Sequence, residues 1–335
     1  YDPQVAVPTA SRDAAPPGGF RMPSAPLRPA ALLLLAIALA GCGAPQGAPG
    51  ASTAVVTSSS GSASGSGSAT GTPSEPIASD SAGLPIPGDC LKGSLATRVQ
   101  GTLTIGTDNP AYEPWFSDND PANGKGYESA VAYAIAGKLG FAASDVVWTK
   151  VPFNKAVLPG AKDFDFDLNQ VSITEARKKA VDFSSGYYDV VQAVVTYAGS
   201  PIDGTTSVAD LKDAKLGAQV GTTSLTAISD QIGAKASVYD TNDAAVQGLL
   251  AKQIDGIVVD LPTAFYMTAA QLDDGVIVGQ LPLAGDTPEQ FGAVLDKGSA
   301  LTGCISAAVD SLRGDGTLDA LVAQWLSAQG APALK

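Results

Sequence analysis

The 335-residue sequence contains no histidine, only two methionines and only three cysteines, and aromatic residues make up 6% of it. The absence of histidine excludes a triad of the Ser-His-Asp type and leaves an ordinary zinc site without its commonest ligand. The chain has 20 basic against 33 acidic residues, a formal net charge of −13. A surface this acidic repels nucleic acid. We therefore expect no metal, no cofactor and no nucleic-acid partner.

The N-terminal region carries the features of an export signal. A short basic region ending at Arg28 precedes an apolar run, residues 30–40, that is too short to cross a bilayer comfortably. Leu39–Cys42 then resembles the lipobox of bacterial lipoproteins. On that resemblance residues 1–41 are a signal peptide, with Met22 as an alternative start, and the cysteine carries the lipid. A plain signal peptide or a buried helix is the alternative interpretation.

A segment poor in large apolar residues follows the lipobox. Residues 42–89 are rich in serine, glycine, alanine, threonine and proline, so they have little apolar surface from which to form a core. We predict a disordered linker, with an r.m.s. reach of roughly 35–40 Å. With Cys42 lipidated, Cys90 and Cys304 remain as an even pair in an exported protein, which predicts a disulfide between them. Two buried thiols are the alternative.

From Gly101 onward short β-rich runs alternate with helical stretches, the pattern of an α/β protein with mainly parallel sheets. Predicted strands cover residues 103–106, 164–168, 190–197, 215–220, 255–259 and 277–281. Predicted helices cover residues 128–139, 207–211, 244–251, 299–312 and 318–327. In doubly wound sheets ligands bind beyond the carboxyl ends of the strands. The polar residues at those ends are therefore the candidate site.

The strand end at Asn169–Arg177 gives the strongest local signal. Thr174 followed by Glu175 predicts a helix N-cap and an acidic first turn that contains Arg177. Free backbone N–H groups at a helix start attract an anion, and a guanidinium can add a two-pronged contact to a carboxylate. An ordinary strand-to-helix connection with the arginine on a solvated face is the alternative.

Two further strand ends are polar. Gly221 permits a tight turn after the strand over residues 215–220, and Thr222 and Thr223 place hydroxyls beside the N–H groups of a starting helix. Asp260 ends an apolar strand and needs a cation to compensate its charge, unless it caps the following helix. Two groups for a carboxylate and one acid for an ammonium together describe a site for a free α-amino acid.

Aromatic residues supply candidate walls for the ligand's side chain. A loop with three aromatic residues follows Asp108: Tyr112, Trp115 and Phe116. A fourth aromatic residue, Phe153, comes later in the chain. Aromatic rings offer apolar contact and cation–π contact, although each one singly is as compatible with a core. The charge of Asp108 favours a neutral or cationic ligand side chain over an anionic one.

These segments, in this order, resemble the family 3 solute-binding proteins of ABC importers, over about residues 101–327. Six blocks carry the resemblance: Gly106–Asp108 with Tyr112, Ser172–Arg177, Val181–Ser184 with Tyr187-Tyr188, Val220–Thr223, Val259-Asp260 and Gly314–Leu318. The resemblance implies that Arg177 and Thr223 bind the ligand's α-carboxylate and that Asp260 binds its α-ammonium, with the Ser172 hydroxyl beside it. It also implies that Tyr112 and Phe153 stack on the side chain.

The resemblance implies a two-lobed type II periplasmic-binding-protein fold. Lobe 1 would comprise residues 90–197 and 283–335, and lobe 2 residues 198–282, with hinge strands near Thr196–Ser200 and Val278–Pro282. The expected protein is a monomer, anchored by lipid to the outer face of the cytoplasmic membrane, which delivers an amino acid to an ABC permease and its ATPase.

Two residues depart from the family pattern and leave the ligand's identity open. Asn169 and Gln170 stand where the family has small residues, so their amides re-shape the predicted pocket. Two other functions remain open. One is an exported dehydratase on the same fold with Glu113 or Asp108 as a base, although no histidine or metal cluster accompanies them. The other is a receptor whose closure signals to a membrane partner.

Overall fold

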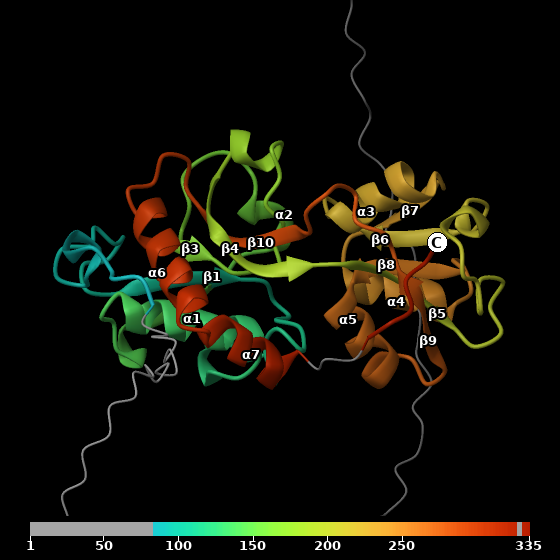
Figure 1. The fold of residues 1–335 in the computed structure, drawn as a ribbon, viewed down its shortest axis with the longest axis horizontal. Coiled ribbons are helices and arrows are strands. Elements are labelled where there is room, and N and C mark those ends of the chain that lie inside the picture. Colours follow the sequence, from blue (N-terminus) through green and yellow to red (C-terminus); the bar gives the residue numbers. More distant parts are fainter. Residues whose placement is uncertain (1–82, 327–329) are drawn as a thin grey trace, which may run out of the picture. The chain divides into compact units, whose positions relative to one another are not determined.

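Two five-stranded β-sheets organise the chain in a computed structural model that describes residues 83–326 and 330–335 (Figure 1). These residues belong to one compact unit. The predicted signal peptide and lipidated Cys42, and most of the predicted linker, lie outside the described residues. In the described part of the chain, no helix has the length and apolar character that crossing a membrane requires.

The first sheet forms lobe 1 and has the strand order β2-β1-β3-β10-β4. Its strands are β1 (Leu103–Thr107), β2 (Val146–Lys150), β3 (Phe166–Asp167), β4 (Asp182–Val190) and β10 (Glu289–Leu295). β1 pairs in parallel with β2 and β3, whereas β10 pairs antiparallel with β3 and β4. The sheet is therefore mixed, with four strands in one direction and β10 in the other.

The second sheet forms lobe 2 and repeats this arrangement in the order β7-β6-β8-β5-β9. Its strands are β5 (Gln192–Tyr197), β6 (Leu216–Gln219), β7 (Ala236–Tyr239), β8 (Gly256–Asp260) and β9 (Gly275–Gln280). Here β5 is the strand that pairs antiparallel with both of its neighbours. The predicted α/β class and two-lobed fold are confirmed, with mixed sheets in place of the expected mainly parallel ones.

Helices cover both faces of each sheet (Figure 1). Lobe 1 contains α1 (Tyr127–Lys138), α2 (Phe153–Ala156), α6 (Thr302–Gly314) and α7 (Thr317–Trp325), and lobe 2 contains α3 (Thr223–Ala227), α4 (Asn242–Leu250) and α5 (Leu261–Tyr266). One turn of π-helix extends α3 through Ile228–Ile232 and another extends α5 through Met267–Gln271. Short 3-10 helices occupy Gly88–Cys90, Pro121–Asn123, Ala143–Asp145, Arg177–Lys179 and Val208–Leu211.

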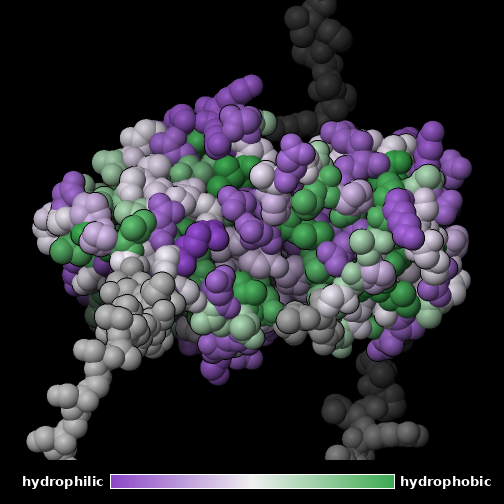
Figure 2. Space-filling model, viewed as in Figure 1, coloured by the Kyte–Doolittle hydropathy of each residue, from purple (hydrophilic) through white to green (hydrophobic). Residues whose placement is uncertain are grey.

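The core of lobe 2 shows why its strands are so apolar. Val194 and Val258 pack toward α3, while Val195 and Ile257 pack toward α4 and α5 on the other face. Because successive side chains of a strand point to opposite faces, a strand covered on both sides must be apolar at every position. Hydrophilic residues are spread over the visible outer face, with hydrophobic ones between them (Figure 2).

The chain crosses between the lobes at places other than those predicted. β4 ends at Val190 in the first sheet and β5 begins at Gln192 in the second, so the first crossover precedes the predicted hinge at Thr196–Ser200. The second crossover lies between β9 and β10, at residues 281–288, and so begins within the predicted Val278–Pro282 segment. The first boundary was wrong because the run of β-branched residues in β5 predicts a strand but does not say which sheet that strand joins.

The C-terminal tail corrects a second boundary. Residues 330–335 were predicted to belong to lobe 1, but they pack on lobe 2. Leu334 is 5% exposed in the lobe 2 core, and its backbone N–H donates to Gln280 O at 2.9 Å. Lys335 N donates to Thr206 O at 3.1 Å. Since α7 packs in the core of lobe 1, the chain passes between the lobes a third time.

The predicted Cys90–Cys304 disulfide is present in the structure. Cys90 lies in the segment before β1, and Cys304 lies in α6 after the second crossover. The bond therefore joins the two separate pieces of chain that make up lobe 1. Both cysteines are buried in its core.

Candidate functional site

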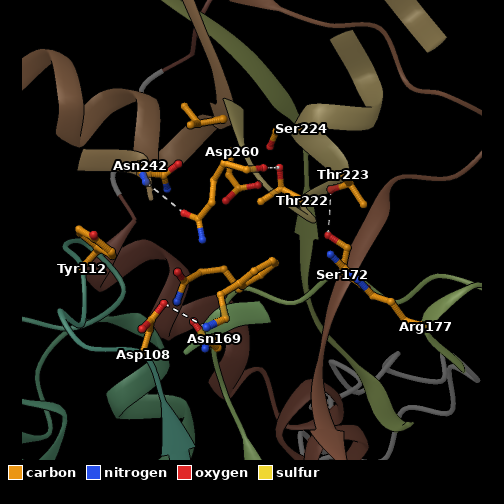
Figure 3. A pocket seen from close by; sticks show the side chains of 14 residues that line it. Asp108, Tyr112, Asn169, Ser172, Arg177, Thr222, Thr223, Ser224, Asn242 and Asp260 are labelled. Atoms are coloured by element: carbon orange, nitrogen blue, oxygen red, sulfur yellow. Dashed lines mark hydrogen bonds between the residues drawn. The ribbon is translucent and has the colours of Figure 1, made fainter. Parts of the chain in front are cut away.

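A polar pocket lies between residues of the two lobes (Figure 3). Lobe 1 supplies Asp108, Tyr112, Phe153, Asn169, Gln170, Ser172 and Arg177, and lobe 2 supplies Gln219, Thr222, Thr223, Ser224, Asn242, Val259 and Asp260. The cavity has a volume of about 40 Å³, room for a few water molecules. Ten of the eleven ligand-binding residues predicted from the sequence line it.

Arg177 lies at one end of the pocket, but not in an α-helix as predicted. Ile173 N donates to Gln290 O, so this stretch remains extended against β10, and only a 3-10 turn fits before β4 begins at Asp182. Thr174 Oγ1 accepts from Arg177 N at 3.2 Å, which is the predicted side-chain cap on a shorter element. The carboxylate-binding potential here therefore comes from the guanidinium rather than from a helix start.

The Arg177 guanidinium is held by two backbone carbonyls, one from each lobe. Nη1 donates to Ser172 O at 2.6 Å and Nη2 donates to Gly221 O at 2.9 Å. Its Cζ lies 5.6 Å from the centroid of the Phe153 ring. Burial lowers the pKa of Arg177, and the nearby acids Glu289 and Asp260 oppose that effect. The group is thus fixed and keeps N–H donors for an anion.

Hydroxyl groups from both lobes lie beside this arginine. Ser172 Oγ and Thr223 Oγ1 are 3.3 Å apart, a hydrogen bond that joins lobe 1 to lobe 2 (Figure 3). Thr222 accepts from Leu225 N at 3.1 Å and so caps α3. Gly221 has φ +76°, and a Cβ there would lie 2.7 Å from Asn154 Oδ1 of lobe 1. Glycine therefore permits the close approach of the lobes at this end.

Asp260 supplies the acid of the site and does not cap α5. It is the residue before that helix, but its side chain makes no capping bond and instead accepts from Gln192 Nε2 at 3.4 Å. Burial raises the pKa of the Asp260 carboxyl to about 8, and the neighbouring Glu289 adds to this. Among the described residues no salt bridge joins Asp260 to Arg177. An ammonium group from a ligand would compensate this acid.

Asp108, Tyr112 and Asn242 lie at the opposite end of the pocket from Ser172, Thr223 and Arg177 (Figure 3). The Asp108 carboxylate accepts from Asn109 N at 2.7 Å and Phe153 N at 3.2 Å. Tyr112 donates its hydroxyl to Asp243 Oδ2 of α4 at 3.2 Å, so its ring and the acceptor side of its hydroxyl oxygen are left to contact a ligand.

Trp115 is the predicted site residue that the structure does not bring to the pocket. Its side chain is 0% exposed in the lobe 1 core, and its Nε1 donates to Thr263 Oγ1 of lobe 2 at 3.0 Å. Phe116 is equally buried. The loop after Glu113 folds back onto the sheet, so these rings pack against the core rather than against a ligand. We leave Trp115 out of the proposed binding set.

Sequence reasoning missed four lining residues, all from lobe 2. Gln219 is the last residue of β6, Val259 is the last but one of β8, and Asn242 and Ser224 lie in the first turns of helices. Asn242 follows Thr241, whose side chain caps α4 by accepting from Ala244 N. Thr241 before the predicted helix is visible in the sequence as a cap. It could have indicated that the start of α4, with Asn242, is a second helix start at the site.

The fold and this pocket together define a two-lobed binding protein of the type II periplasmic class. A family model, bacterial extracellular solute-binding proteins, family 3, matches residues 103–328. The chain belongs to this family. Its relatives are transport binding proteins rather than enzymes, which agrees with the prediction that this chain binds a ligand without catalysing a reaction.

Several relatives are amino-acid-binding proteins by name. The chain is 30% identical to the L-cystine-binding protein TcyJ of Escherichia coli, covering 74% of this chain and 91% of that protein. It is 28% identical to the L-arginine-binding protein of Pseudomonas aeruginosa, covering 68% and 91%. Among solved structures, an ancestral arginine-binding protein bound to arginine has a TM-score of 0.55 at 31% identity, covering 68% and 98%.

Proposed function

We propose that the protein binds a free amino acid in the pocket between its lobes. The supporting observation is that a guanidinium, Arg177 of lobe 1, and a carboxyl, Asp260 of lobe 2, line one cavity with no salt bridge between them among the described residues. A zwitterion fits this pair because its carboxylate can bind the guanidinium while its ammonium compensates the acid. Thr223 supports the carboxylate, and Ser172 adds a hydroxyl to the ammonium group.

The bound amino acid would then be delivered to an ABC permease and its ATPase. Family membership supports this role, and so do the relatives named for cystine and arginine binding. The hydrogen bonds that join the lobes around the pocket support a closed form that a membrane partner could recognise.

A thermal-shift screen of the purified protein against the twenty amino acids and cystine tests the binding proposal. A ligand at about a hundred times its dissociation constant should add ~2.7 kcal/mol to the free energy of unfolding. For a folded body of this size that corresponds to a rise in Tm of about 5–10 °C. A screen in which no compound raises Tm would contradict the proposal.

The protein is further proposed to be held at the outer face of the cytoplasmic membrane by a lipid on Cys42. Support comes from the sequence, in which a basic region, an apolar run and Leu39–Cys42 occur in that order. A Cys42→Ser variant expressed in a bacterial host should move from the membrane fraction to the soluble exported fraction. If the variant stays with the membrane, the lipid is not what holds the protein there.

A further inference from the structure

The lobe 1 amides in the pocket have their nitrogens turned toward protein partners. Asn169 Nδ2 donates to Val151 O at 3.2 Å, and Gln170 Nε2 donates to Glu128 Oε2. Neither amide oxygen accepts a hydrogen bond from a described residue, and neither is among the fully buried polar atoms that lack a partner. Since both residues line the pocket, these two oxygens are the atoms that the lobe 1 amides leave for a ligand there.

Glu128 fixes the orientation of the Gln170 amide. Glu128 is 0% exposed and accepts three hydrogen bonds, from Gln170 N at 2.8 Å, from Gln170 Nε2 and from Tyr187 Oη. Gln170 has φ +49°, an uncommon value for a residue other than glycine, and the two contacts with Glu128 hold it there. The ionised Glu128 carboxyl only accepts, so in that form it requires the Gln170 amide nitrogen to face it and the amide oxygen to face away.

Three acids near the Gln170 side of the pocket, Glu128, Asp167 and Asp108, have no salt-bridge partner among the described residues. Asp167 is 0% exposed, neither of its oxygens has a partner, and burial together with Glu128 and Asp108 raises its pKa well above the usual range. In the described ranges none of these three acids forms a salt bridge. Lys162 is the cation that acts on Asp167, but its ammonium donates to Leu158 O.

Lobe 2 contributes two amides to the pocket, those of Gln219 and Asn242. Gln219 accepts from Asn242 N at 3.1 Å through its Oε1, so its amide nitrogen is the atom left for a ligand. On the lobe 1 side, however, Asp108, Asn169 and Gln170 all offer oxygen. A ligand side chain that extends toward this side meets acceptor oxygens, with buried acids behind them whose ionised form a cation would favour. Both features favour an N–H donor that carries positive charge.

We propose that the pocket selects amino acids whose side chain ends in a cationic N–H donor, an ammonium or a guanidinium, and that Glu128 is a positioning residue acting through the Gln170 amide. This inference rests on the proposed amino-acid function. It goes beyond that function because it names the class of ligand side chain. It also names a residue, Glu128, that influences this preference although it does not line the pocket.

Titration calorimetry of the full chain with matched ligand pairs tests the side-chain class. Citrulline has the shape of arginine but a neutral urea group, and norleucine has nearly the shape of lysine without its charge. We expect arginine or lysine to bind at least about tenfold more tightly than its neutral counterpart, because a hydrogen bond to a charged group is stronger than a neutral one. Glutamate should bind more weakly still.

A Glu128→Gln variant tests the positioning role. Its amide nitrogen can donate to Gln170, which would turn the Gln170 amide over and present N–H to the pocket. The ratio of arginine to citrulline affinity should then fall by at least about fivefold, a change that general destabilisation would not produce. Glu113→Gln is the matched control, since Glu113 accepts from Ser117 and Asp118 outside the pocket, and its ratio should not change.

Gln170→Asn is a second variant in case Glu128→Gln does not fold. Asparagine tolerates the left-handed backbone but is too short to reach Glu128 in the same way, so the ratio should fall here too. Equal affinity for citrulline and arginine, or tighter binding of glutamate or cystine, would overturn the side-chain class. An unchanged ratio in both variants would overturn the role of Glu128. If no amino acid binds at all, the proposed function itself fails and this inference with it.

Discussion

An Arg177→Ala variant should bind the amino acid found in the screen about 30- to 5,000-fold more weakly. Removing one partner of a desolvated charge pair costs about 2–5 kcal/mol, and here the ligand's carboxylate would lose the guanidinium that Ser172 O and Gly221 O hold in place. Calorimetric titration gives the affinity. The two carbonyls stay close to water in the pocket, so thermal unfolding should show a folded protein.

Two matched variants sharpen this result. Arg177→Lys keeps the charge but loses the planar fork, so its affinity should lie between those of the wild type and the alanine variant. Lys178→Ala removes the neighbouring exposed cation, which pairs with Glu175 at 2.8 Å, and should leave affinity unchanged. If Arg177→Ala binds within about threefold of the wild type, the carboxylate is bound elsewhere.

Amino-acid affinity should increase by about tenfold per pH unit from pH 5 to 7 and level off around pH 8. Burial raises the pKa of the Asp260 carboxyl to about 8, so below that value the free protein holds a proton there. A ligand ammonium favours the ionised form, so binding expels the proton and becomes easier as the pH rises. Titrations in buffers of different ionisation enthalpy should show release of about one proton at pH 6–7.

The raised pKa of Asp260 also determines how the stability of the ligand-free protein changes with pH. An acid whose pKa is raised by folding stabilises the folded state fully below its unfolded value, about 4, and this contribution is lost as the pH rises toward 8. Asp260→Asn should remove most of the pH dependence of binding. Glu128, whose pKa burial raises to about 7, titrates in the same window, so the Glu128→Gln variant measures its share. A flat affinity profile in the wild type would show that Asp260 does not meet the ammonium.

The sequence predicted most pocket residues because they share one visible property, a polar side chain at or after the end of an apolar strand. Asp108 and Gly221–Thr223 follow strands whose carboxyl ends face the pocket, and Asp260 is the last residue of such a strand. The disulfide was also predictable, since the predicted lipidation of Cys42 leaves the other two cysteines as a pair.

The features that were not predicted from the sequence depend on contacts between residues far apart in the chain. β4, with a glycine and three polar residues in its interior, lacks the apolar pattern of a central strand, and its place comes from its pairing with β10 about a hundred residues later. Glu128 looks like an ordinary acid in the first turn of a helix, yet it lies inside the protein under Gln170. Trp115 looks like an exposed loop residue, although its ring is packed in the core.

The return of the C-terminal tail to lobe 2 limits how far the lobes can separate. Leu326 is packed in the core of lobe 1, while Leu334 is packed in that of lobe 2 and residues beside it are hydrogen-bonded to Gln280. From Leu326 to Leu334 the chain has eight Cα–Cα steps, which span at most about 29 Å. Any opening that would place these two residues farther apart than this must first extract one of the two leucines from its core. The tail therefore acts as a stop that sets the largest entrance available to an arriving ligand.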